Sequence, residues 1–134
     1  MQSRRVSPAV IGLAAGLDAA LLLLFVLIGR ASHGESLLGV LITWWPFLAG
    51  LAVGWLVTRA WRHPLRIRWT GLGVVAVTVA VGLLLRVASG QGVQLSFVIV
   101  TVAVISVFLL GWRAIGLLVR RLRRRSDPTV EPAR

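Results

Sequence analysis

Four long apolar runs constrain this chain more than any other feature of its sequence. They cover about residues 9–29, 37–58, 70–87 and 95–119. Each run has at least about 18 residues, the length that a helix needs to cross the ~30 Å hydrocarbon core of a bilayer. A segment in lipid must satisfy its own backbone hydrogen bonds, and these runs do not alternate polar and apolar residues as barrel strands do. We therefore predict an all-α fold, an integral membrane four-helix bundle with short loops.

The composition is that of one small membrane domain. Hydrophobic residues make up 57% of the 134 residues, above the roughly 45–50% that is typical of soluble domains. We predict a single domain over residues 1–125 and a disordered polar tail over residues 126–134. We expect the first run to be a retained helix, because it is too long for the apolar region of a signal peptide and carries Asp18.

Few side chains of this chain can support chemistry. It has no Cys, two His and four acidic residues, so disulfides, thiolate metal sites and cysteine nucleophiles are excluded. His33 and Glu35 share one predicted loop, but two side chains are too few for a metal site. We therefore predict no catalytic residue, no metal, no cofactor and no enzymatic activity.

Arginine alone gives the chain its net charge of +11. Of the fifteen arginines, only Arg30 and Arg86 fall in or beside the first and third predicted loops; the other thirteen lie on the opposite side of the predicted bundle. The positive-inside rule then places both termini in the cytoplasm and the protein in the cell's inner (cytoplasmic) membrane. Because the charges flank apolar runs, the expected partner is anionic lipid at the cytoplasmic face, not nucleic acid. The arginines expected to contact this lipid are Arg59, Arg62, Arg66, Arg68, Arg120, Arg121, Arg123, Arg124 and Arg125.

Asp18 is the only acidic residue inside an apolar run. It lies near the middle of the first predicted helix, where an ionised carboxylate costs roughly 2.5–3.5 kcal/mol. It is either a proton or cation site, or a protonated carboxyl whose hydrogen bonds fix the helix packing. Arg86 is expected to be a better ion-pair partner for it than Arg113. The neighbours expected from their depth in the membrane are Trp44, Trp45, Thr78 and Ser106.

Two further patterns concern helix packing. Pro46 lacks a backbone N–H and is expected to kink the second helix, either for packing or to form an aromatic-lined pocket beside Asp18. Glycines spaced by four residues form faces that allow close helix contact. Contacts within the bundle and contacts with a second copy of the chain explain these faces equally well. The glycines are Gly12, Gly16, Gly50 and Gly54.

Several short motifs, in order along the chain, resemble those of a known family. They are Asp18, Gly29-Arg30-x-Ser32-His33, Trp45-Pro46-Phe47 with Gly50 and Gly54, Phe97-Val-Ile-Val100, and Leu110-Gly111-Trp112-Arg113. The chain is similar over about residues 8–113 to the domain-of-unknown-function family 3054, small four-helix membrane proteins of actinobacteria and haloarchaea. This resemblance implies a topology and no activity. It adds Arg30, His33 and Arg113 to Asp18 and Pro46 as positions of one pattern.

Two functions of different kinds fit the sequence. The first is a structural or accessory membrane subunit that binds a membrane-protein partner, a second copy of itself or lipid. The second is a small proton-coupled transporter or channel that uses Asp18. The two functions differ in whether Asp18 lines a water-accessible cavity or a dry contact between helices.

Overall fold

The computed structural model of the protein describes residues 5–31, 34 and 36–126. Its helices are α1 (Pro8–Arg30), α2 (Leu37–Thr58), α3 (Leu72–Ala88) and α4 (Leu95–Arg125), and a π-helical turn, η2 (Ile67–Gly71), leads directly into α3. Within the described residues, four helical segments are long and apolar enough to cross a membrane. The all-α fold with four spans is therefore confirmed, and the chain is a multi-pass membrane protein. His33 and residues 127–134 of the predicted tail lie outside the described residues.

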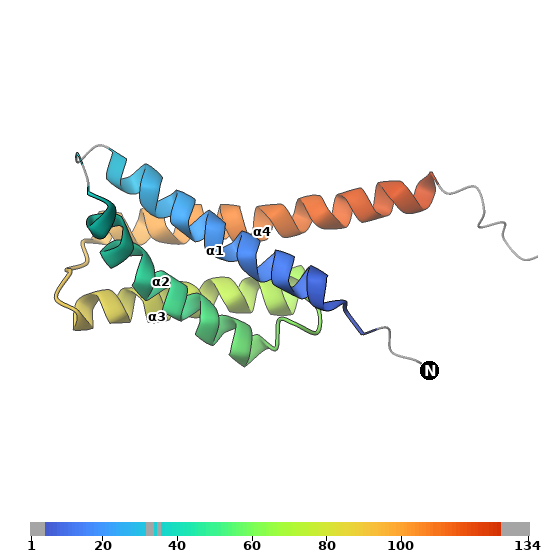
Figure 1. The fold of residues 1–134 in the computed structure, drawn as a ribbon, viewed down its shortest axis with the longest axis horizontal. Helices are drawn as coiled ribbons and strands as arrows, with labels where there is room; N and C mark the ends of the chain where they lie inside the picture. The colour runs from blue at the N-terminus through green and yellow to red at the C-terminus, as the bar shows by residue number, and fades with distance from the viewer. Residues whose placement is uncertain (1–4, 32–33, 35, 127–134) are drawn as a thin grey trace, which may run out of the picture.

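The helices run alternately in opposite directions (Figure 1). Each packs against the next, α1 on α2, α2 on α3 and α3 on α4, and α4 closes the ring by packing against α1. The contact between α2 and α3 is much the most extensive of the four. Helices α1 and α4 therefore pack less closely against their neighbours than α2 and α3 do.

The two ends of the bundle differ in charge. We call the end with the start of α1 and the 59–66 loop the basic end. Its exposed arginines are Arg5, Arg59, Arg62, Arg66, Arg68, Arg120, Arg121, Arg123, Arg124 and Arg125. At this end α4 continues past the other helices (Figure 1). We call the other end, where α1 and α3 finish and α2 and α4 begin, the far end.

Helix boundaries follow local signals where such signals exist. Ser7 and Ser36 cap α1 and α2, each accepting a 3.3 Å hydrogen bond from the backbone N–H three residues on, as helix N-caps do. Arg59 ends α2 in the left-handed conformation, with φ of 51°, a position that glycine more often takes. Helix α2 runs through Pro46 without interruption.

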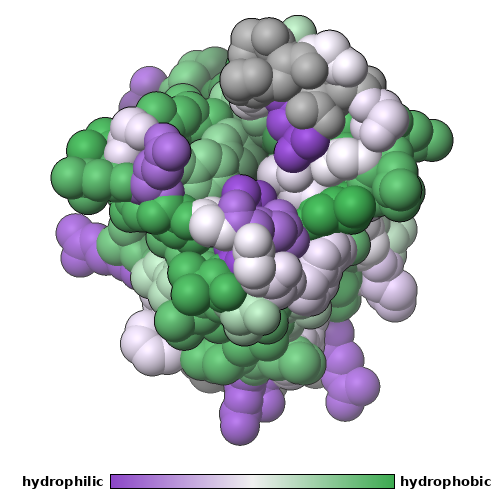
Figure 2. Space-filling view, turned by 90° about the vertical axis from the view of Figure 1, so that its left-hand side faces the viewer, coloured by the Kyte–Doolittle hydropathy of each residue, from purple (hydrophilic) through white to green (hydrophobic). Residues whose placement is uncertain are grey.

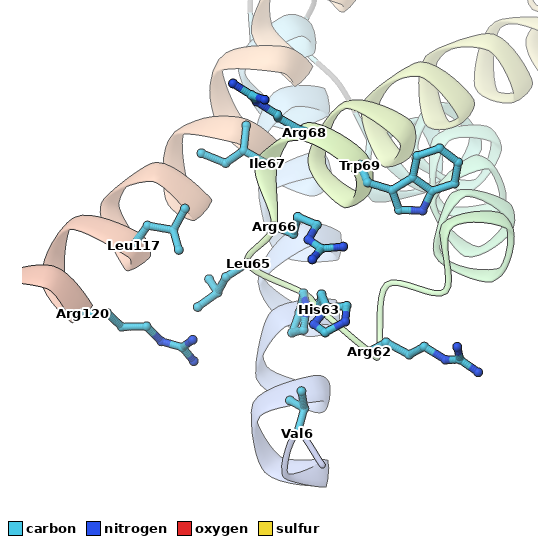
Figure 3. Close-up of a pocket in the computed structure, with 11 residues that line it drawn as sticks. Val6, Arg62, His63, Leu65, Arg66, Ile67, Arg68, Trp69, Leu117 and Arg120 are labelled. Carbon is cyan, nitrogen blue, oxygen red and sulfur yellow. The ribbon is translucent and has the colours of Figure 1, made fainter. Parts of the chain in front are cut away.

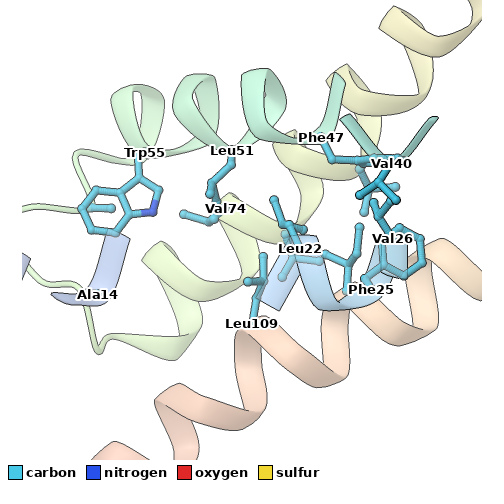
Figure 4. Packing of buried hydrophobic residues seen from close by; sticks show 14 residues of the cluster. Ala14, Leu22, Phe25, Val26, Val40, Phe47, Leu51, Trp55, Val74 and Leu109 are labelled. Atoms are coloured by element: carbon cyan, nitrogen blue, oxygen red, sulfur yellow. The ribbon is translucent and has the colours of Figure 1, made fainter. Parts of the chain in front are cut away.

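A mixed aliphatic and aromatic core fills the space between the helices (Figure 4). Leu22 of α1, Phe47 of α2 and Leu109 of α4 are each almost completely buried. The rings of Phe25 and Phe47 meet edge to face with centroids 5.7 Å apart, and the Phe97 ring lies within 6.5 Å of both. Such aromatic contacts stabilise a core beyond the area that they bury.

Glycines allow the close approach of α2 and α3. A Cβ atom on Gly50 would lie 2.7 Å from the carbonyl oxygen of Thr78, and one on Gly54 would lie 3.2 Å from that of Val74. Of the two explanations for the glycine faces, packing within the bundle fits Gly50 and Gly54. It does not fit Gly12 and Gly16, because a Cβ atom on either would meet nothing within 4 Å. These two glycines lie on the outer side of α1, so for them only contact with a second copy stays a prediction.

Candidate functional site

Asp18 faces the interior of the bundle. Helix α1 buries the stripe of Ala14, Asp18, Leu22 and Phe25, and this spacing of three or four residues places all four side chains on one helix face. The Asp18 side chain is completely buried. A carboxylate at this depth is stable only if protein groups replace its lost hydration.

Three side chains from two other helices supply those groups. The Arg113 guanidinium donates from Nη1 to Oδ1 of Asp18 at 2.8 Å and from Nη2 to Oδ2 at 2.7 Å. The indole N–H of Trp112 donates to Oδ1 at 2.7 Å, and that of Trp55 donates to Oδ2 at 2.8 Å. We call these four residues the Asp18 cluster.

The hydrogen bonds of the Asp18 cluster show which form of the carboxyl it holds. Both Asp18 oxygens accept two hydrogen bonds, and all four partner atoms are donors. A protonated carboxyl would need an acceptor for its own hydrogen. The cluster therefore fits the ionised carboxylate, and the expectation of a protonated carboxyl is wrong, because a fully buried Arg113 neutralises the charge.

Arg113 also connects the Asp18 cluster to the basic end. Its Nε donates to the carbonyl oxygen of Pro64 at 2.9 Å, and its Nη1 donates to that of Leu109 at 2.8 Å. The guanidinium carbon lies 4.6 Å from the centre of the Trp112 ring, a cation–π contact. One ion pair thus joins α1, α2, α4 and the 59–66 loop.

The structure does not gather the other predicted neighbours around Asp18. Arg86 was expected to be its partner, but Arg86 instead donates to Gln91 Oε1 at 2.8 Å at the far end. The indole N–H of Trp44 and the hydroxyl of Thr78 are buried and have no hydrogen-bond partner among the described residues. Trp45 is 43% exposed and Ser106 is half-buried. The bidentate ion pair and two indoles leave the Asp18 carboxylate no free acceptor site for any of them.

The predicted aromatic pocket beside Asp18 is also not what the structure shows. Pro46 is fully buried within α2, and two cavities of about 660 and 510 Å³ among the described residues are lined by neither Asp18 nor Trp44 nor Pro46. The packing interpretation of Pro46 is therefore the one that fits. The expected kink itself stays a prediction.

One of these cavities lies at the basic end, between the 62–69 segment and α4 (Figure 3). Its volume is about 660 Å³. Four of the nine arginines predicted to contact lipid line it, namely Arg62, Arg66, Arg68 and Arg120. Arg121 borders a smaller neighbouring hollow, whereas Arg59, Arg123, Arg124 and Arg125 are exposed outside the large cavity. Pro64 also lines the cavity, so the Arg113 hydrogen bond anchors its wall.

The apolar part of the basic-end cavity comes from three elements. Val6 precedes α1, Trp69 belongs to η2 and Leu117 belongs to α4. Figure 3 shows Leu117 and Arg120 on α4, across the cavity from the 62–69 segment. The Trp69 side chain is 64% exposed, as is common for tryptophans at a membrane interface. The cavity therefore combines cationic and apolar walls.

The family-pattern residues occupy different parts of the molecule. Arg113 belongs to the Asp18 cluster, whereas Arg30 lies at the far end and donates from Nη1 to the hydroxyl of Thr43.

The described residues contain no group of three His, Cys, Asp or Glu side chains that could hold a metal ion.

Comparison with known proteins gives one match. The sequence profile described as "Protein of unknown function (DUF3054)" matches residues 15–116, which include Asp18, Trp55, Trp112 and Arg113. No curated protein and no solved structure matches the chain.

Proposed function

Because this chain belongs to the DUF3054 family, which has no assigned activity, we propose its function from its own geometry. We propose a structural or accessory subunit of the cytoplasmic membrane that binds anionic lipid headgroups at its basic end. The observation that carries this proposal is the cavity in which four arginines meet apolar side chains. Its orientation, with the basic end in the cytoplasm, follows from the arginine distribution.

The Asp18 cluster supports a structural function for the bundle centre. Its charges are paired, its carboxylate is saturated with donors, and Asp18 and Arg113 are completely buried. An ion pair of this kind is strongly destabilised when one partner is lost. The Asp18 cluster joins α1 and α4 to the other helices. These two helices make fewer backbone contacts with their neighbours than α2 and α3 make with each other.

The chemistry of the basic-end cavity supports an anionic lipid as its ligand. Guanidinium groups bind phosphate through several parallel hydrogen bonds, and a basic pocket between membrane helices is a typical site for a phosphorylated headgroup. The described residues that line this cavity include no carboxylate to neutralise the arginines. Ile67, Trp69 and Leu117 provide apolar walls, against which the glycerol backbone and upper acyl chains would pack.

A competition between two lipids tests this proposal. Native mass spectrometry of the protein from nonionic detergent should show preferential retention of phosphatidylglycerol over phosphatidylcholine. The double variant Arg66→Gln/Arg120→Gln should lose about 2 kcal/mol of that preference, at about 1 kcal/mol for each arginine near the headgroup. The matched control Arg124→Gln/Arg125→Gln removes the same amount of charge outside the cavity. It should retain most of the preference for phosphatidylglycerol. Equal losses in both double variants, or no preference in the wild type, would refute the proposal.

A proton-coupled transporter that uses Asp18 is the second candidate. The observation in its favour is that the hydroxyls of Thr78 and Thr101 are buried in the helix interior without a hydrogen-bond partner among the described residues. The saturated and paired carboxylate of Asp18 favours the structural function instead. Proton flux in liposomes, measured with the Asp18 variants discussed below, distinguishes the two.

A further inference from the structure

A second cavity opens at the far end of the bundle, away from both the basic end and the Asp18 cluster. Its volume is about 510 Å³, and residues of all four helices line it. Figure 2 looks at this end and shows hydrophilic residues gathered at its centre with hydrophobic residues around them. The volume lies within the roughly 300–1,000 Å³ range of ligand-binding cavities.

Arg86 is the central cation of this cavity. Its guanidinium carbon lies 4.6 Å from the centre of the Phe97 ring, and its Nη1 donates to Gln91. Its Nε is buried and has no hydrogen-bond partner among the described residues. Both described contacts are to neutral groups, and a buried N–H without an acceptor is costly. Arg86 therefore has the capacity and the energetic reason to bind an additional acceptor.

The other polar groups at the cavity are also donors or can act as donors. Arg30 lines the same cavity from the end of α1, so a second guanidinium faces the space that Arg86 faces. The hydroxyls of Thr43 and Ser96 and the amide of Gln94 also line it. Of the described lining residues, none is acidic.

The remaining wall of the cavity is apolar. Phe25, Val26, Phe97 and Val100 line it, and Phe25 and Phe97 continue into the aromatic cluster of the core. A small hydrated anion would leave this wall without a partner, whereas an apolar group attached to the anion would cover it. We propose that the far-end cavity binds an amphipathic organic anion, a phosphate or carboxylate joined to an apolar chain, with Arg86 as the main contact of the anionic group.

Isothermal titration calorimetry tests this inference. It measures the binding of octyl phosphate to the purified protein in nonionic detergent. We expect a saturable far-end site in addition to any binding at the basic end, with inorganic phosphate and octanol each binding there at least about tenfold more weakly, because each supplies only half of the complementary chemistry. Arg86→Gln should weaken octyl phosphate binding about tenfold or more, since it removes a charge-assisted contact. Arg86→Lys keeps the charge and should recover part of the affinity. Gel filtration of each variant checks that it is folded.

The variant Arg66→Gln/Arg120→Gln separates the two ends of the molecule. It should keep the octyl phosphate binding that Arg86→Gln weakens, because both of its substitutions lie at the basic end. If this variant abolishes binding while Arg86→Gln and Arg86→Lys bind as the wild type does, the inference is wrong and the anion binds at the basic end. Equal binding of octanol and octyl phosphate, or no saturable binding, would also overturn it. The lipid proposal for the basic end stands or falls separately.

Native mass spectrometry then identifies the source of the anion. If Arg66→Gln/Arg120→Gln retains an anionic lipid that is lost when Arg86→Gln is added to it, the ligand is a membrane lipid. If octyl phosphate binds through Arg86 but no lipid is retained there, the ligand is a water-soluble organic anion. Either result supports the assignment of the far-end cavity.

Discussion

At the scale of single residues, the ion pair between Asp18 and Arg113 is the feature on which most of the structure depends. Both side chains are completely buried and joined by two hydrogen bonds of 2.7 and 2.8 Å. Removing one partner leaves a buried charge without compensation, whereas removing both leaves neutral groups. The energetic effect of the pair is therefore expected to be strongly non-additive.

We accordingly predict that Asp18→Asn and Arg113→Gln each cost about 3–5 kcal/mol, and that the double variant recovers more than half of the summed loss. Thermal unfolding in detergent, followed by tryptophan fluorescence, measures this, since Trp55 and Trp112 contact the pair. Arg68→Gln, at an exposed position, is the matched control and should change stability by less than about 0.5 kcal/mol. Additive losses would contradict a paired structural function. A proton flux present in the wild type and lost in the folded double variant would instead favour the transporter.

The importance of Asp18 could be predicted from the sequence, but its partner could not. Counting residues along each helix places Arg86 and Arg113 each about 10 Å from Asp18 along the membrane normal, and Arg86 was preferred because it lies outside the clusters of arginine. Side chains on a helix tilt toward its N-terminus. Because α1 and α4 run in opposite directions (Figure 1), the side chains of Asp18 and Arg113 tilt toward each other and close this gap. Trp55 and Trp112 were not among the expected neighbours of Asp18, although their indoles donate to it.

At the scale of helices, the contact between α2 and α3 depends on the absence of side chains. A Cβ atom on Gly50 would meet the backbone of Thr78, and one on Gly82 would meet the Phe47 ring. Backbone atoms cannot move aside as the end of a flexible side chain can. A methyl group at Gly50 must therefore push the two helices apart.

We predict that Gly50→Ala destabilises the protein by about 1–3 kcal/mol, as overpacking in a tight core does. Gly16→Ala is the matched control, because a Cβ atom there would meet nothing within 4 Å. Its stability should be equal to or slightly above that of the wild type, since alanine favours helix more than glycine does. The thermal midpoints of the two purified variants in the same detergent test this. Equal destabilisation by both substitutions would show that the glycines act through backbone flexibility and not through packing.

The existence of the four helices could be predicted from hydropathy, and some of their ends could not. The first two helices begin and end within one residue of the predicted bounds, and Ser7 and Ser36 cap their N-termini. Hydropathy ended the fourth run at residue 119, whereas α4 continues to Arg125. Arginine and leucine are strong helix formers whatever their affinity for lipid. No sequence signal predicted the π-helical turn η2, which shifts the start of the third helical segment to Ile67.

At the scale of the whole molecule, charge is arranged along the bundle axis. The centre is neutral because Asp18 and Arg113 cancel. The basic end carries ten exposed arginines among the described residues, and the far end carries Arg30 and Arg86 at one cavity. The sequence could predict the charge groups of the two ends as topology signals. It could not predict that each borders a cavity, because that depends on how the helices cross.

The arginine asymmetry predicts a single orientation of the bundle, with the basic end in the cytoplasm. Translocating a loop rich in arginine is unfavourable, so the side with more arginine remains inside. A reporter that is active only in the cytoplasm should be active when fused after Arg134. A reporter that is active only outside the cytoplasm should be active when fused to a chain truncated after Ser89, which ends at the far end. Exchanging the two reporters is the internal control, and both exchanged fusions should be silent.

The reverse pattern would place the basic end outside and refute cytoplasmic lipid binding. Activity of both reporters at one site would show dual orientation. The far-end cavity would keep its chemistry in either case, because its lining depends only on how the helices pack.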